Sequence, residues 1–405
     1  MRQRLLFVSP RFLFPVDSGG KIRTTQILRG LKHGEYEVTL VSPASPDQQH
    51  AYRESIEGVC DRFVAWSGCS AAMATAARLA AIASALPIPV ATDRSRAGSR
   101  AVRRELESVP NVVVFDFPHS AVLAPADVPV PSVMFTHNIE AEIFARHARV
   151  SALPLRLLWQ SQLRKMRVFE QAVLQRFDTV VAVSERDADV FRREYLVENV
   201  RTIGTGVDLE FFSYAGPGSS DHVVFTGSMD WLANRDGIDF LLERVWPNIA
   251  REVASARMTV VGRDPPPWLA RKAERWGSSW QLTGYVDDVR SYVHAAGVYV
   301  IPLRVGGGTR LKVYEAMALG CPVVSTSIGI EGLPLVPGEH YLRADGEEEF
   351  AAAVVELMKN TELRGRLATA ARRFVEERCS FRAVAREFER ICMDTEESSR
   401  GRGES

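Results

Sequence analysis

The sequence predicts an α/β protein with two doubly wound domains, each built from a parallel sheet covered by helices. The first observation is length, because 405 residues is about twice a usual single domain. The second is pattern: short apolar runs typical of buried strands alternate with helical runs throughout the chain. The third is a break in that series at GPGSSD, a stretch with the composition of a linker.

The strand and helix runs place the domains. RLLFVS, VTLVS, NVVVFDF, SVMFTH and DTVVAVS supply the first sheet, and a long helix over 153–177 packs one apolar face. HVVFTGS, ARMTVVG, WQLTGYV, VYVIPL and CPVVST supply the second. We predict a first domain at residues 1–212, a linker at 213–221 and a second domain at 222–378. A last amphipathic helix at 379–395 and a disordered tail at 396–405 follow.

Composition narrows the class of protein. Hydrophobic residues make up 46% and charged residues 25%, as in a soluble globular protein. Lys plus Arg and Asp plus Glu number 50 each, so charge gives no indication of a nucleic-acid partner. The five cysteines form no CxxC pair and no metal-ligand spacing, which favours a reducing cytoplasm. No signal-length segment opens the chain, and residues 71–91 are too interrupted to predict a membrane span.

Residues 306–326, GGGTRLKVYEAMALGCPVVST, carry the strongest chemical signal. Three glycines leave a buried strand, and a helix follows that ends at Gly320 before Pro322. Free N–H groups and the positive end of the helix dipole then lie at the carboxyl edge of the sheet, where a diphosphate is commonly held. Arg310 and Lys312 add positive charge, and Glu315 lies one turn further, within reach of sugar hydroxyls. A plain strand-to-helix turn is the weaker alternative.

This stretch closely resembles the nucleotide-sugar motif of the retaining GT-B glycosyltransferases of family 4 (group 1), in a glycine-rich branch. The usual motif has two glutamates eight apart; this chain has only the second, Glu315, and Gly307 occupies the first position. The resemblance continues through FTGSMDW, VGRDPP, TGYVDD and, near the N-terminus, SPRFLFPVDSGGKIRT. It implies two Rossmann-like domains facing across a cleft, with the last helix crossing back to the first domain.

The resemblance also implies an activity and a site. A sugar would pass from a nucleotide diphosphate donor to an acceptor hydroxyl on a glycan or lipid-linked molecule, with no cofactor, no metal and no protein base. Catalytic roles are predicted for His119, Arg310 and Lys312, with His137 as the alternative histidine. The residues predicted to bind the donor are Gly19, Gly20, Gly227, Ser228, Gly306, Gly307, Gly308, Thr309 and Glu315.

Other interpretations remain open. GTGVDL at 204–209 is a broken dinucleotide fingerprint, which argues against a nucleotide-dependent oxidoreductase. A non-catalytic nucleotide-sugar-binding protein of the same fold would also explain the motif. Five arginines form a basic cluster after the Ala-rich segment, namely Arg94, Arg96, Arg100, Arg103 and Arg104. The cluster predicts either a solvated helix face or contact with anionic lipid on the inner face of the membrane.

Overall fold

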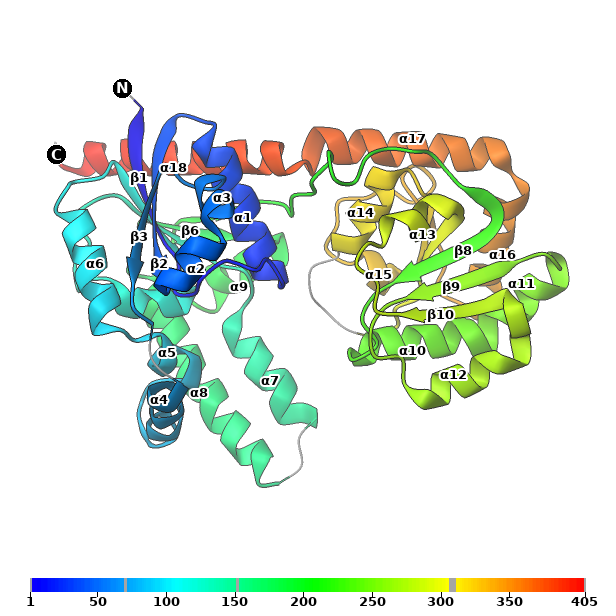
Figure 1. Cartoon of the computed structure of the whole chain (residues 1–405), viewed down its shortest axis with the longest axis horizontal. Helices are drawn as coiled ribbons and strands as arrows, with labels where there is room; N and C mark the ends of the chain where they lie inside the picture. The colour runs from blue at the N-terminus through cyan, green and yellow to red at the C-terminus, as the bar shows by residue number, and fades with distance from the viewer. Residues whose placement is uncertain (1, 69–70, 151–152, 306–310, 404–405) are drawn as a thin grey trace. The chain divides into compact units, whose positions relative to one another are not determined.

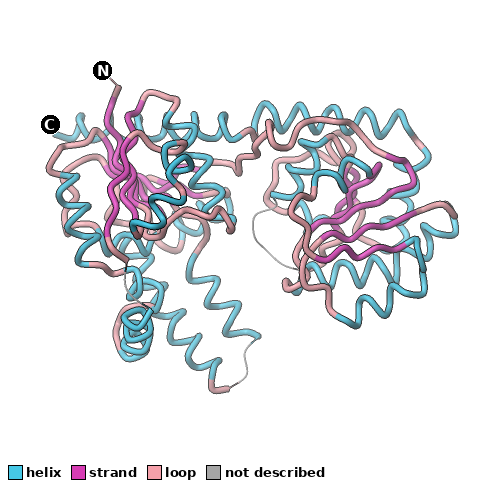
Figure 2. The backbone as a smooth tube through the Cα atoms, in the orientation of Figure 1, coloured by secondary structure: helices cyan, strands magenta, loops and turns pink. Residues whose placement is uncertain are grey.

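The structure is a computed structural model and describes residues 2–68, 71–150, 153–305 and 311–403. It divides into two compact units, Met1–Gly206 with Arg382–Ser405, and Val207–Phe381. Each unit contains one parallel sheet, of seven strands in the first and six in the second. Figures 1 and 2 show that helices cover the sheet within each unit. The predicted α/β class is therefore confirmed.

The first sheet has the order β3-β2-β1-β4-β5-β6-β7. All of its pairings are parallel. Its strands are β1 (Gln3–Val8), β2 (Tyr36–Pro43), β3 (Arg62–Trp66), β4 (Val112–Asp116), β5 (Ser132–Phe135), β6 (Thr179–Ala182) and β7 (Val200–Thr202). β4 and β5 are buried at every position, which is why they read as continuous apolar runs.

Helices cover both faces of this sheet. They are α1 (Gly19–Lys32), α2 (Pro46–Ala51), α3 (Arg53–Glu57), α4 (Ala71–Ala83), α5 (Ile88–Asp93), α6 (Arg96–Leu106), the 3-10 helix η1 (Pro118–Leu123), α7 (Glu140–Val150), α8 (Leu155–Leu174) and α9 (Glu185–Arg193). The last helix, α18 (Phe381–Gly403), also belongs to this unit. It buries Phe388 against Phe135 of β5, with ring centroids 5.0 Å apart.

The second sheet has the order β10-β9-β8-β11-β12-β13. Its strands are β8 (Ser219–Thr226), β9 (Arg257–Val261), β10 (Trp280–Gly284), β11 (Ala296–Ile301), β12 (Val323–Ser325) and β13 (Leu342–Arg343). The helical elements are α10 (Leu232–Phe240), η2 (Leu241–Val245), α11 (Trp246–Glu252), α12 (Pro267–Ala273), η3 (Glu274–Ser279), α13 (Arg290–Ala295), α14 (Leu311–Leu319), α15 (Ser327–Ile330), α16 (Glu347–Lys359) and α17 (Thr361–Arg378).

Both sheets reverse their strand order once, between β1 and β4 in the first unit and between β8 and β11 in the second. Open α/β sheets bind ligands outside the carboxyl ends of the strands at such a reversal. The loops that follow these four strands are therefore the first places to look for a site. Among the described residues, no helix combines the length and apolarity needed to cross a bilayer.

Two boundaries differ from the sequence-based expectation. The tail expected to be disordered over 396–405 is helical through Gly403, because α18 continues to Gly403. Thr395 and Glu396 are buried, and the Tyr36 hydroxyl donates to the Glu396 carboxylate at 2.5 Å, so packing extends this helix beyond its apolar pattern. The units divide after Gly206, and β8 starts at Ser219, inside the stretch predicted as a linker.

Candidate functional site

In the first unit, the carboxyl ends of β1, β4 and β5 hold a buried polar network centred on Asp116. Ser9, directly after β1, donates to Asp116 Oδ2 at 3.1 Å. Thr24 of α1 donates to both carboxylate oxygens at 3.1 and 3.2 Å. His137, two residues after β5, places Nε2 2.7 Å from Asp116 Oδ1. A fully buried carboxylate needs such partners, because an unpaired buried charge is strongly disfavoured.

Arg23 fixes the protonation of His137. Its NH1 lies 3.2 Å from His137 Nδ1, and a guanidinium can only donate. Nδ1 must therefore accept, and the ring proton lies on Nε2 and is donated to Asp116. Burial lowers the pKa of His137 and outweighs the opposing effect of Asp116, so the ring is neutral at pH 7. Arg23 is itself buried and donates to Thr205 Oγ1 at 3.2 Å.

Phe117 joins this network to His119. Its ring stacks on His137 with centroids 4.1 Å apart and on His119 with centroids 5.1 Å apart. Phe117 has φ 67°, a strained value for a residue with a β carbon that is most often found at functional sites. Its ring also lies where a side chain on Gly20 would stand, 2.7 Å from an ideal β carbon there. The position of Gly20 at the start of α1 therefore depends on close approach to Phe117.

His119 differs from His137 in what its second nitrogen contacts. Nδ1 lies 2.6 Å from Asp93 Oδ2 of α5. Within the described residues, no hydrogen bond reaches Nε2. Glu140, at the start of α7, is buried beside the same pair; burial raises its pKa, and nearby His119 and Arg11 partly offset this. The group Arg11, Asp93, His119 and Glu140 thus offers a free imidazole nitrogen next to carboxylates.

In the second unit, Lys312 on α14 crosses to the end of β8. Its Nζ lies 3.1 Å from Asn234 Oδ1 and 3.5 Å from the Thr226 carbonyl. The ammonium also sits 4.2 Å from the centroid of the Phe225 ring. Asn234 continues the chain of contacts by donating from Nδ2 to the Ser228 carbonyl at 2.7 Å. A cation is therefore held at the strand reversal of the second sheet.

Glu315 follows Lys312 by three residues on α14, so the two side chains lie on one face of the helix. Burial raises the pKa of Glu315 to about 7, even though Lys312 opposes the shift. Burial raises the pKa of Tyr299 on β11, and the nearby Glu315 carboxylate adds to this rise. A partly buried carboxylate with a raised pKa at a strand reversal is characteristic of functional sites.

Two glycines allow the backbone segments that follow β8 and β9 to approach each other closely. A β carbon on Gly262, after β9, would stand 1.9 Å from the Gly227 carbonyl oxygen, and one on Gly227 would stand 2.8 Å from Asn234 Nδ2. Ser228 is fixed by Arg263, whose Nε donates to Ser228 Oγ at 3.0 Å. Gly227 and Ser228 thus follow β8 in close contact with Asn234, which also binds Lys312.

The predicted residues therefore fall into two groups. Gly19, Gly20 and His119 belong to the first unit, near its strand ends, and Gly227, Ser228, Lys312 and Glu315 belong to the second, near its strand ends. Gly306, Gly307, Gly308, Thr309 and Arg310 lie outside the described residues. Sequence reasoning missed Asp116 and Asp93, the carboxylates next to His137 and His119. Asp116 ends a predicted strand, a signal that could have identified it; Asp93 follows no strand.

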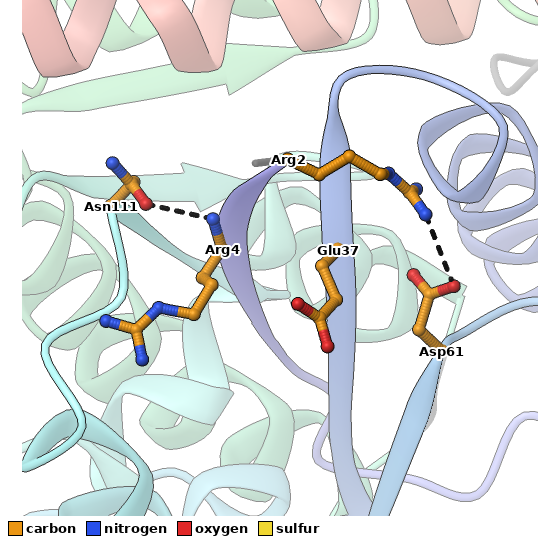
Figure 3. Close-up of a pocket in the computed structure, with 5 residues that line it drawn as sticks. All are labelled: Arg2, Arg4, Glu37, Asp61 and Asn111. Atoms are coloured by element: carbon orange, nitrogen blue, oxygen red, sulfur yellow. Dashed lines mark hydrogen bonds and ion pairs between the residues drawn. The ribbon is translucent and has the colours of Figure 1, made fainter.

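A separate cavity of about 480 Å³ lies at the opposite, amino edge of the first sheet. Arg2, Arg4, Glu37, Asp61 and Asn111 line it, and Figure 3 shows Arg2 paired with Asp61 and Asn111 bound to the backbone of Arg4. Open α/β sheets hold ligands at the other edge, outside the carboxyl ends of the strands. We assign this cavity no part in the site.

Solved structures with the same architecture establish the fold as GT-B. Sucrose-phosphate synthase from Thermosynechococcus elongatus has a TM-score of 0.65 at 17% identity, covering 97% of this chain and 99% of its own. Anabaena HepE in complex with UDP has a TM-score of 0.66 at 14% identity, covering 97% and 100%. A structure of TarM, a protein of S. aureus, has a TM-score of 0.68 at 11% identity, covering 97% of this chain and 99% of its own.

Family comparison then identifies the chain. Residues 18–211 match the profile described as Glycosyltransferase Family 4, and residues 220–360 match the one described as Glycosyl transferases group 1. The chain belongs to the family 4, group 1 glycosyltransferases, as its motifs predicted.

Two curated relatives match part of the chain. A phosphatidyl-myo-inositol mannosyltransferase of Mycobacterium leprae is 28% identical over 220 residues, 52% of this chain and 58% of the relative. An uncharacterized 44.6 kDa protein in the cps region of Klebsiella pneumoniae is 26% identical over 163 residues, 38% of this chain and 42% of the relative. The chain thus spans about half the length of the curated relatives it matches.

Proposed function

We propose that this protein transfers a sugar from a nucleotide diphosphate sugar to an acceptor hydroxyl, with retention of anomeric configuration. The observation that carries the proposal is the pairing of Lys312 and Glu315 on one face of α14, with the ammonium 3.1 Å from Asn234 at the end of β8. The Lys312 ammonium would bind the diphosphate of the donor, and the Glu315 carboxylate would bind the hydroxyls of the adjoining ribose. Family membership supports the same activity.

The leaving diphosphate is the chemical difficulty, because its developing negative charge must be stabilised by fixed dipoles and cations. We assign this to Lys312 and Arg310, with the amides of residues 306–308. Glu315 would accept hydrogen bonds from the ribose hydroxyls, which requires its ionised form. The departing phosphate would help to deprotonate the acceptor on the same face, so the reaction requires no protein base. Because these cations carry the charge, we propose that no divalent metal is needed.

In the first unit, we propose that Gly19 and Gly20 approach the diphosphate. α1 begins at Gly19 with no side-chain cap on its first amides, so these amides can donate to an anion. No atom lies within 4 Å of an ideal β carbon on Gly19, which leaves room for a ligand beside the backbone.

We assign His119 a contact with the reacting sugar through Nε2. Asp93 holds the opposite nitrogen of the ring, so the imidazole can donate or accept in a fixed direction. His137 has a different role, since both of its nitrogens are bonded to Arg23 and Asp116. It orders the strand ends and does not face the substrate.

We propose a glycan or lipid-linked acceptor, in polysaccharide or glycolipid assembly at the cytoplasmic face of the membrane. This rests on the relatives, one named for phosphatidyl-myo-inositol and one from a cps region. Donor hydrolysis tests the activity: the pure protein is incubated with a panel of nucleotide sugars and free nucleotide diphosphate is measured. Slow release from one donor is expected. Nucleotide-sugar binding without release from any donor, with or without added glycan acceptors, would favour the non-catalytic binding protein.

A further inference from the structure

The helices α7 and α8 form a hairpin that projects from the sheet of the first unit (Figure 1). Exposed leucines gather where α8 begins. Leu153, Leu155 and Leu157 are exposed to 70%, 55% and 60%. Three large apolar side chains exposed within five residues are unusual on a protein surface and commonly mark an interaction site.

The charge of the hairpin is as unusual as its apolar end. The protein has equal numbers of cations and carboxylates, yet residues 143–169 contain five arginines, one lysine and no aspartate or glutamate. Arg149, Arg156 and Arg164 are exposed, and none has an ion pair or side-chain hydrogen bond among the described residues. By contrast, Lys165 is used within the fold, donating to the carbonyls of Ala81 and Ile82 at 3.0 and 2.9 Å.

The start of α8 adds positive charge. The helix runs for 20 residues, has no acidic residue in its first turn, and has no side-chain cap at Pro154. The first amides of α8 and its dipole therefore favour an anion at this end. Leu155, Arg156 and Leu157 occupy this turn, so apolar side chains and positive charge are interleaved.

We propose that Leu153, Leu155 and Leu157, with Arg149, Arg156 and Arg164, form a surface that docks on an anionic lipid bilayer. The leucines would enter the boundary between headgroups and acyl chains while the arginines stay at the phosphates. The leucines and the arginines together favour an anionic bilayer over other partners. A polyanion such as nucleic acid would leave the leucines exposed to water, and a second copy of this chain would bring like charges together. The projecting shape suits a planar surface better than a groove-bound peptide.

The sequence predicted a different surface for lipid contact, on the arginines of α6. On α6, Arg96, Arg100, Arg103 and Arg104 are exposed on one face. In the apolar segment before them, Leu86 packs against the core, whereas Ile82 is 46% exposed. The hairpin instead exposes three leucines within five residues, with arginines between and beside them, and we therefore place the lipid contact there.

Liposome flotation of the full chain tests the proposal without any nucleotide sugar, so its outcome is independent of the proposed activity. The protein should float with vesicles of phosphatidylglycerol and phosphatidylcholine at low salt and be released as salt rises. Leu155→Ser with Leu157→Ser should weaken binding about tenfold or more, and Arg149→Gln with Arg156→Gln about fivefold per arginine. Because all four side chains are exposed, thermal stability should not change.

Matched controls make the test specific. Leu232→Ser changes a leucine that is 60% exposed on α10 of the second unit and should float like wild type. Arg96→Gln with Arg100→Gln should retain most of the binding.

Three results would overturn the proposal: no flotation of wild type, equal flotation with neutral vesicles, or loss in the α6 variant but not in the hairpin variants. A leucine variant that converts a dimer to a monomer on size-exclusion chromatography and still floats would assign the surface to a second copy instead.

Discussion

Replacing Glu315 by Gln should stabilise the free protein while weakening nucleotide binding. Burial raises the pKa of Glu315 from 4.5 to about 7, so the folded state binds a proton more tightly than the unfolded state. The free energy of unfolding therefore falls as pH rises from about 4.5 to 7. A shift of this size corresponds to about 3 kcal/mol when the group is fully ionised. Glutamine removes this cost but leaves a buried amide, so we expect a net gain of about 1 to 2 kcal/mol at pH 8.

Urea unfolding at pH 5 and pH 8 measures the effect. Other titrating groups, such as Glu170 with a pKa raised to about 8 by burial, are shared by both proteins and cancel in the comparison. The advantage of the variant should grow by about 2 kcal/mol between these pH values. A constant difference between the two proteins would refute the raised pKa.

Calorimetry with nucleotide diphosphate addresses function. Wild-type affinity should fall as pH drops below about 7, because protonation removes the proposed ribose acceptor. The variant should bind more weakly at pH 8 and lose this dependence. Wild-type affinity in Glu315→Gln at every pH would exclude the carboxylate from the site, whatever its effect on stability.

Four further predictions concern the other proposed roles. Lys312→Ala should weaken nucleotide diphosphate binding by roughly 1.5 to 3 kcal/mol, the value of a charge-assisted bond; unchanged calorimetric affinity would count against it. His119→Ala should lower kcat much more than donor affinity, whereas His137→Ala should lower the melting temperature by leaving a buried carboxylate and guanidinium underpaired; the reverse pattern would exchange their roles. Gly19→Ala should weaken donor binding without changing stability, and Gly20→Ala should destabilise the fold through contact with Phe117; equal thermal shifts in the two variants would contradict this. Activity should survive treatment with EDTA, and loss restored by Mg²⁺ or Mn²⁺ would disprove metal independence.

The sequence predicted the fold well because the buried strands and amphipathic helices of a parallel α/β domain each have a recognisable local pattern of apolar residues. β4 and β5 are buried along their whole length, so each reads as an unbroken apolar run. Weaker strands escaped prediction. β3 is half-exposed, β7 has three residues, and β13 has two, so their pairing with a neighbouring strand decides their conformation. The expected disordered tail was wrong for a similar reason, since contacts with Tyr36 and the first sheet hold residues near Glu396 in helix.

For the site, the sequence determined which residue types follow which strands. His119 and His137 each come after a predicted strand, and Lys312 and Glu315 are separated by almost one helical turn. What they contact was decided only by the tertiary structure. Arg23 reaches His137 across 114 positions, and Lys312 reaches Asn234 across 78.

The physical reason is that local periodicity fixes where a side chain starts, whereas its protonation and free hydrogen-bonding atoms depend on burial and on neighbours distant in sequence. The sequence by itself thus determined that the chain has two α/β domains, each with a parallel sheet, and that it carries the family motif. The fold decided that both ring nitrogens of His137 are bonded and that burial raises the pKa of Glu315 to about 7. It also decided that Nε2 of His119 has no hydrogen-bond partner among the described residues.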